Sequence, residues 1–179
     1  RANGALGSTD GAGLAGQTSG GSKAWTDQVG TWAIATNKAQ ASALSGGLAV
    51  ATIDAGIRNV CIEMTTVRSA GNVGGVALWT NINNHVKFYH DGTNAVCVQV
   101  VAGTPATLIT AVATVASGAR CRLHIDGTRV LLYYNDLYIG TSNVLDASLT
   151  ATQHGLYTSD IGNTQDAFAV LARNGYTVL

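Results

Sequence analysis

Residues 85–101 read HVKFYHDGTNAVCVQVV, two short alternating segments joined by a turn. In residues 85–90, apolar side chains alternate with polar or aromatic ones, the period of two that is expected where a β-strand buries one face. The turn at residues 91–94 is Asp-Gly-Thr-Asn, and Asp, Gly and Asn tolerate the positive φ that hairpin turns require. Residues 95–101 alternate again. This stretch predicts a β-hairpin.

The same pattern recurs along the chain, with turn signals about every eight to twelve residues, the spacing typical of a sandwich or barrel. No helical period lasts beyond two turns. We therefore predict an all-β fold, an antiparallel β-sandwich of the jelly-roll type with about 12 strands and little or no helix. The predicted strands are residues 31–35, 38–43, 48–54, 60–67, 75–80, 85–90, 95–101, 107–113, 119–125, 129–134, 153–157 and 167–171.

Charge is scarce and balanced in this chain of 179 residues: 11% of them are charged, with ten Lys and Arg against ten Asp and Glu. A nucleic-acid partner or an anionic membrane surface would call for clustered excess Lys and Arg. No apolar run approaches the roughly 20 residues of a membrane-spanning helix. We therefore expect no nucleic-acid partner and no membrane insertion. The three cysteines are an odd number, and buried free thiols are expected.

The first part of the chain differs in composition from the rest. Residues 1–23 are rich in Gly, Ser, Ala and Thr and have no sustained period, which predicts an extended lead-in or assembly loop. Residues 24–179 are expected to form a single β-sandwich domain. Residues 11–16 match GxGxxG, but a dinucleotide site needs a strand before and a helix after that motif, and neither can be placed.

Several short motifs are similar to those of a concanavalin A-like, laminin-G-like jelly-roll module of the kind found in bacteriophage tail and other virion proteins. They are residues 1–7 (RANGALG), 30–34 (GTWAI), 74–80 (GGVALWT), 130–136 (VLLYYND) and 166–170 (DAFAV). The resemblance implies a jelly-roll sandwich and a structural role in a virion.

Catalysis of the kind that glucanases perform on such folds needs two carboxylates, one of them held protonated. Glu63 is the chain's single glutamate, and Asp91, Asp126 and Asp136 lie at predicted turns, where aspartate commonly stabilises the turn. No GxSxG elbow is present. We therefore expect no enzyme activity and name no catalytic residue.

Metal and cofactor sites are not predicted either. The four histidines are not at mutual ligand spacing, and residues 91–94 supply too few oxygens for calcium. A calcium site with ligands distributed over the chain, as in legume-type lectins of this architecture, stays an open alternative.

A candidate carbohydrate site follows from the alternation of faces. On the predicted strands, Val76 and Leu78 oppose Ala77 and Trp79, while Val96, Val98 and Val100 are expected to face the core. If these strands are neighbours in one sheet, the opposite face can pack an aromatic ring on a sugar and bind its hydroxyls with polar groups. The candidate residues on that face are Trp79, Lys87, Tyr89, Gln99, Arg122 and His124.

Two functions remain open. The first is a non-catalytic virion structural module of a phage tail, fibre or decoration protein, which would associate with itself or with other virion proteins, attach to a host-surface glycan, or do both. The alternative is a lectin-like carbohydrate-binding module of a secreted or surface bacterial protein. The first places the chain in the virion and the second outside the cell or on its surface.

Overall fold

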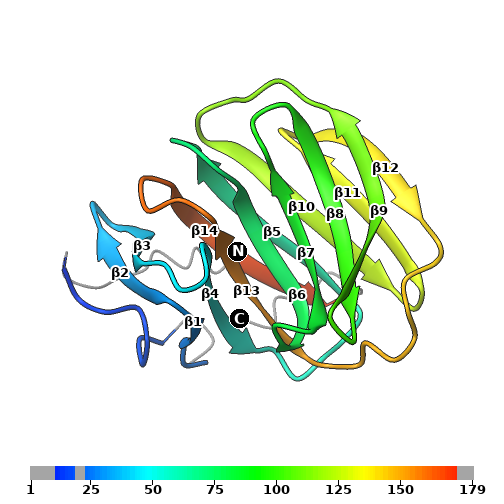
Figure 1. Cartoon of the computed structure of the whole chain (residues 1–179), viewed down its shortest axis with the longest axis horizontal. Coiled ribbons are helices and arrows are strands. Elements are labelled where there is room, and N and C mark those ends of the chain that lie inside the picture. Colours follow the sequence, from blue (N-terminus) through cyan, green and yellow to red (C-terminus); the bar gives the residue numbers. More distant parts are fainter. Residues whose placement is uncertain (1–10, 19–22, 173–179) are drawn as a thin grey trace.

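A computed structural model describes residues 11–18 and 23–172. Over these residues the chain forms fourteen strands and no helix (Figure 1), which confirms the predicted all-β fold. No helix in the described residues is therefore long or apolar enough to cross a membrane. The strands are β1 (Thr26–Val29), β2 (Thr31–Ala35), β3 (Lys38–Ala43), β4 (Ala49–Asp54), β5 (Val60–Val67), β6 (Val73–Asn81), β7 (Asn84–His90), β8 (Asn94–Val101), β9 (Thr104–Val112), β10 (Ala119–Asp126), β11 (Arg129–Tyr134), β12 (Leu137–Ser142), β13 (Gln153–Thr158) and β14 (Thr164–Ala172).

The strands form two seven-stranded antiparallel sheets packed face to face (Figure 1). The first sheet has the order β1-β4-β13-β6-β7-β8-β9, and the second has the order β12-β11-β10-β5-β14-β3-β2. Inward side chains such as Phe88, Ile62 and Leu123 are fully buried in one core between the sheets. The sandwich prediction is therefore confirmed, with β1 and β12 in addition to the twelve predicted strands.

A bulge in β6 changes which side chains face outward. Leu78 has a φ of +50°, and the pairing of β6 with β7 shifts register between Ala77 and Asn81. Ala77 and Leu78 consequently both lie in the main core, whereas Val76 and Trp79 share the outer face. The prediction that Leu78 shares a face with Val76 was wrong, because a bulge interrupts the period of two.

A buried histidine holds this bulge in place. The backbone N–H of Leu78 donates to His154 Nδ1 at 3.4 Å, and His154 Nε2 lies 2.9 Å from the carbonyl oxygen of Ile57. Because a carbonyl only accepts, Nε2 carries the proton and the ring is neutral. Burial lowers the pKa of His154 to about 4, which agrees with this neutral state.

The side chains of β8 point in the opposite directions from those predicted. Cys97 lies directly opposite Phe88 in the β7–β8 ladder and is fully buried in the main core. Val96, Val98 and Val100 form a separate buried cluster with Tyr89 on the outer face. The sequence was ambiguous because both faces of β8 are apolar. All three cysteines are buried and free, as predicted.

The described part of residues 1–23 lies against β2. Leu14 is fully buried in the main core, and its N–H donates to the carbonyl oxygen of Trp32. The N–H of Gly11 donates to the carbonyl oxygen of Ile34. The division of the chain into residues 1–23 and 24–179 stays a prediction, and residues 1–10 and 19–22 lie outside the described part.

Candidate functional site

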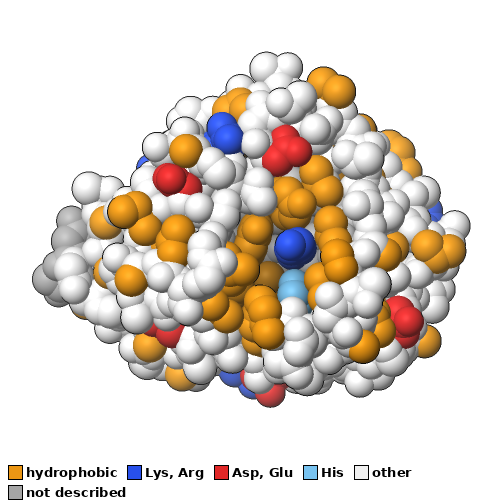
Figure 2. All heavy atoms as spheres, viewed as in Figure 1, with side chains coloured by type: hydrophobic (Ala, Val, Ile, Leu, Met, Phe, Trp, Pro, Cys, Tyr) orange, Lys and Arg blue, Asp and Glu red, His pale blue; other side chains and the backbone are white. Residues whose placement is uncertain are grey.

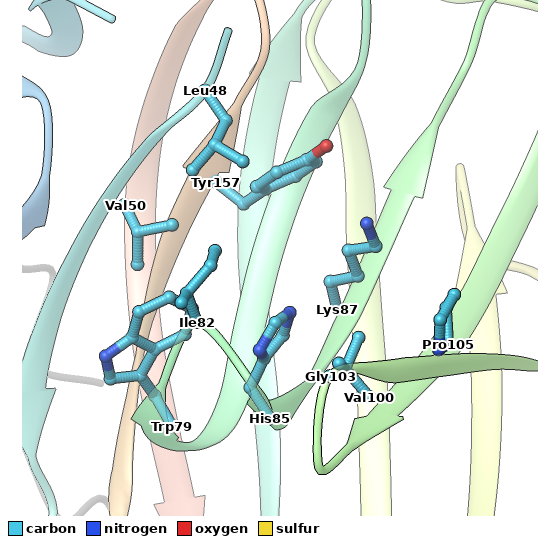
Figure 3. A pocket seen from close by; sticks show the side chains of 10 residues that line it. All are labelled: Leu48, Val50, Trp79, Ile82, His85, Lys87, Val100, Gly103, Pro105 and Tyr157. Atoms are coloured by element: carbon cyan, nitrogen blue, oxygen red, sulfur yellow. The ribbon is translucent and has the colours of Figure 1, made fainter. Parts of the chain in front are cut away.

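The outer face of the first sheet is hollowed over its middle strands. Figure 2 shows one basic side chain and one histidine at the centre of this face, surrounded by hydrophobic side chains. The cavity has a volume of about 160 Å³. We call it the hollow; its lining residues, shown in Figure 3, are Leu48, Val50, Trp79, Ile82, His85, Lys87, Val100, Gly103, Pro105 and Tyr157.

The rings of two tyrosines lie next to each other beside the hollow, because the residue between them in the sheet is a glycine and has no side chain. Gly74 of β6 pairs with Tyr157 of β13 on one side and with Tyr89 of β7 on the other. The two rings lie with their centroids 5.6 Å apart. A Cβ at Gly74 would overlap the backbone carbonyl oxygen of Phe88. The sheet geometry therefore requires glycine here and creates a joint tyrosine surface.

Lys87 extends into the hollow, where Tyr157 also lies (Figure 3). Its Nζ lies 5.8 Å from the centroid of the Tyr89 ring and 5.6 Å from that of Tyr157, within the range of cation–π attraction. Burial lowers the pKa of this half-buried ammonium. No carboxylate lies within ion-pair distance of Nζ in the described part of the chain.

His85 supplies a hydrogen-bond acceptor at the base of the hollow. Its Nδ1 lies 3.2 Å from the carbonyl oxygen of Asn81, so Nδ1 carries the proton in the neutral ring. Burial lowers the pKa of His85 to about 4, which keeps the ring neutral near pH 7. Nε2 is left as an acceptor and has no partner among the described residues.

Trp79 lies in the hollow but offers little surface to a ligand. Its side chain is 2% exposed and packs against the His85 ring at a centroid distance of 4.8 Å. Its indole N–H is buried without a hydrogen-bond partner within the described ranges. Trp79 therefore supports the wall of the hollow. Tyr157 is nearly as buried, at 5% exposed, so the half-buried ring of Tyr89 is the better placed for ligand stacking, with Tyr157 beside it.

Two hairpin tips form one rim of the hollow. The turn between β6 and β7 carries Ile82, whose side chain is 46% exposed, and the turn between β8 and β9 carries Gly103. The N–H of Gly103 donates to the carbonyl oxygen of Asn83 at 2.9 Å, and the N–H of Ala102 donates to Asn84 Oδ1 at 3.0 Å. These bonds hold the two turns together.

Three of the six predicted site residues lie together and three lie elsewhere. Trp79, Lys87 and Tyr89 share the outer face of the first sheet. Gln99 points between the sheets, opposite Val86, and its Oε1 accepts from the N–H of Asp146 at 2.8 Å. Arg122 and His124 belong to β10 in the second sheet. The condition that all these strands are neighbours in one sheet is therefore not met.

Among the aromatic and ionisable residues that line the hollow, sequence reasoning missed His85 and Tyr157. Both lie on predicted strands, and His85 alternates in step with Lys87 and Tyr89, a signal that could have placed it on their face. Tyr157 gave no comparable signal, because β13 lies beside β6 only through pairing between segments distant in sequence.

The outer face of the second sheet carries its own aromatic and basic group. The Arg122 guanidinium carbon lies 4.6 Å from the centroid of the Tyr133 ring, and Glu63 is directly opposite Arg122 in the β5–β10 ladder. The same ladder brings Cys61 Sγ to 3.4 Å from His124 Nε2. Burial raises the pKa of the Cys61 thiol to about 11, so this thiol is not activated as a nucleophile near pH 7.

Metal ligands do not cluster in the described residues: no group of three or more His, Cys, Asp or Glu side chains could hold a metal ion there. The distributed calcium site stays an untested hypothesis.

Comparisons with known proteins show the fold. No protein-family model and no curated protein matches the sequence. The chain is similar to the solved structure of carbohydrate-binding module CBM66 from Bacillus subtilis, with a TM-score of 0.64 and 15% identity over 86% of this chain and 92% of that one. This likeness agrees with the predicted antiparallel β-sandwich.

Weaker likenesses are to two longer or more distant chains. A mutant of the GH43 protein BlXynB from Bacillus licheniformis gives a TM-score of 0.49 at 15% identity, over 82% of this chain and 32% of that one. A native heptameric SAP-like pentraxin from Limulus polyphemus gives 0.40 at 13% identity, over 64% of this chain and 63% of that one.

Proposed function

We propose that this chain is a carbohydrate-binding module and that the hollow is its sugar-binding site. The observation that carries the proposal is the convergence of Tyr89, Tyr157, Lys87 and His85 on one concave sheet face. The fold likeness to CBM66, which spans most of both chains, supports it. The proposed function is binding rather than catalysis, at the surface of a cell or outside it.

The chemistry of the hollow suits a sugar ring. The apolar C–H face of a pyranose or furanose packs on an aromatic surface such as the Tyr89–Tyr157 pair. His85 Nε2 accepts a hydrogen bond from a sugar hydroxyl, and the Lys87 ammonium donates to sugar oxygens. A volume of about 160 Å³ accommodates a small group and not a long segment of polysaccharide.

A glycan array with three forms of the protein tests the proposal. We expect the wild type to bind at least one glycan, and Tyr89→Ala to weaken that binding about fivefold, since one stacked aromatic ring contributes about 1 kcal/mol. The matched control is Tyr138→Ala, which removes an exposed tyrosine of the second sheet. Absence of glycan binding by the wild type, or equal losses in both variants, would contradict the proposal.

The virion role implied by the sequence resemblance is a different function. Nothing in the hollow or in the three likenesses favours it over carbohydrate binding, so assembly with virion proteins stays a prediction.

A further inference from the structure

The ammonium of Lys87 has surroundings that leave its charge unbalanced. Its cross-strand neighbours are Val76 on β6 and Val98 on β8, and its nearest rings are Tyr89 and Tyr157. Aromatic faces attract a cation, but they accept none of its three N–H bonds as a carboxylate or carbonyl would. Within residues 11–18 and 23–172, Nζ has neither an ion-pair partner nor a hydrogen-bond acceptor.

Three arginines elsewhere in the molecule have hydrogen-bond or ion-pair partners. Arg58 donates to the carbonyl oxygens of Leu149 and Gly127, and Arg68 donates to those of Gly71 and Asp91. Arg120 pairs with Asp136 at 3.5 Å. Arg122 is an intermediate case: its guanidinium lies over the Tyr133 ring and opposite Glu63, but its Nε is buried without a hydrogen-bond partner among the described residues. Lys87 differs in that its unpaired ammonium lies in a hollow.

The net charge of the hollow indicates what charge its ligand carries. His85 is neutral near pH 7, so Lys87 alone gives the lining a charge of one. The apolar lining reduces screening by water, and charge attraction is stronger there than on an open surface. One negative charge on the ligand would neutralise the site, whereas a phosphate monoester would bring about two.

We propose that the ligand of the hollow is an acidic sugar, in which one carboxylate or sulfate ester group pairs with Lys87 Nζ while the ring packs on the Tyr89–Tyr157 pair. This inference rests on the proposed function. The neutral His85 then accepts from a hydroxyl of the same sugar, so that the ligand is held by one charge, one hydrogen bond and one stacking surface.

Matched pairs of polysaccharides provide the test. One pair is polygalacturonate and its methyl ester, for the carboxylate, and the other is a sulfated galactan and its desulfated form. Binding of the wild type, Lys87→Gln, Lys87→Arg and Lys38→Gln is measured by calorimetry, alongside the glycan array. Lys38, on β3 of the second sheet, is the charge-matched control. Circular dichroism checks that each variant is folded.

We expect the wild type to prefer an acidic glycan over its neutral counterpart at least tenfold, in one of these pairs or among the array glycans. Lys87→Gln should abolish that preference, Lys87→Arg should keep most of it, and Lys38→Gln should leave it unchanged. Raising the salt concentration from about 0.05 to about 0.5 M should weaken it, since exposed charge attraction is screened.

Two results would overturn the inference in distinguishable ways. If the wild type binds neutral glycans as tightly as acidic ones, or if Lys87→Gln keeps the preference, the acidic ligand is wrong while carbohydrate binding stands. If the wild type binds no glycan of either pair or of the array, the proposed function fails and the inference fails with it.

Discussion

The two outer faces of the sandwich each place a basic side chain over tyrosine, yet in different surroundings. On the second sheet, Arg122 lies over Tyr133 and directly opposite Glu63, although its Nε is buried without a hydrogen-bond partner among the described residues. On the first sheet, Lys87 lies in a hollow beside two tyrosines, and no acidic residue is its cross-strand neighbour. Both faces therefore combine a cation with tyrosine, and the cation of the first sheet points into a hollow that a ligand can enter.

The largest expected effect is on the free energy of unfolding, and it distinguishes the two faces by how tightly their side chains are packed. Trp79→Ala should lower the free energy of unfolding by about 3–5 kcal/mol, because it removes a large buried ring from the wall of the hollow. Tyr133→Ala, on the half-buried face of the second sheet, should cost about 1 kcal/mol. Urea unfolding followed by circular dichroism measures both. Similar losses in the two variants would mean that both faces are equally packed.

An effect of intermediate size is expected in the pH dependence of the free energy of unfolding. His154 has a pKa of about 4 in the folded chain against about 6.5 when unfolded, so between these values the unfolded state binds more protons. The stability contributed by neutral His154 is therefore complete above about pH 6.5 and is lost as the pH falls towards 4. Between about pH 7 and about pH 4.5 we expect a loss of about 2 kcal/mol from this group.

His154→Gln is the informative variant for that loss. Glutamine keeps one acceptor and one donor for Leu78 and Ile57 but does not titrate, so the pH dependence should become flatter. His85, with a similar pKa, should account for much of the remaining slope. Unfolding free energies measured at both pH values decide this, and an unchanged slope in His154→Gln would show that the bulge is not the acid-sensitive element.

The smallest expected change in the free energy of unfolding has opposite signs on the two faces. Lys87→Met should raise the free energy of unfolding by about 1 kcal/mol, because it replaces an unpaired, half-buried charge by an apolar chain of similar length. Arg122→Met should lower it by about the same amount, because it leaves Glu63 without the opposite charge. Thermal unfolding of the two variants at one pH gives the comparison, and shifts in the same direction would refute it.

Much of the fold could be predicted from local sequence. Alternation located twelve of the strands, and turn residues such as Asp91 and Gly92 located the hairpins between them. β1 and β12 were missed because short segments such as residues 26–29 have no clear period of two.

The candidate site was only partly predictable, because it depends on pairing between distant segments. Whether β10 joins the sheet of β7 is decided by the whole topology, which removed Arg122 and His124 from the site. The positive φ of Leu78 carries no local signal, since a leucine ordinarily avoids it. Trp79 does lie on the predicted face, but it does so because of this bulge and not because of the alternation that the prediction assumed.

The rim of the hollow and the sheet beside it differ in how freely they can evolve. Gly74, between the two tyrosines, is fixed by backbone contacts, so its replacement would disturb the sheet itself. The rim residue Ile82 is exposed on a turn, where substitutions cost little stability. Substitutions at the rim could therefore change which ligand the hollow accepts, while Tyr89 and Tyr157 keep their positions.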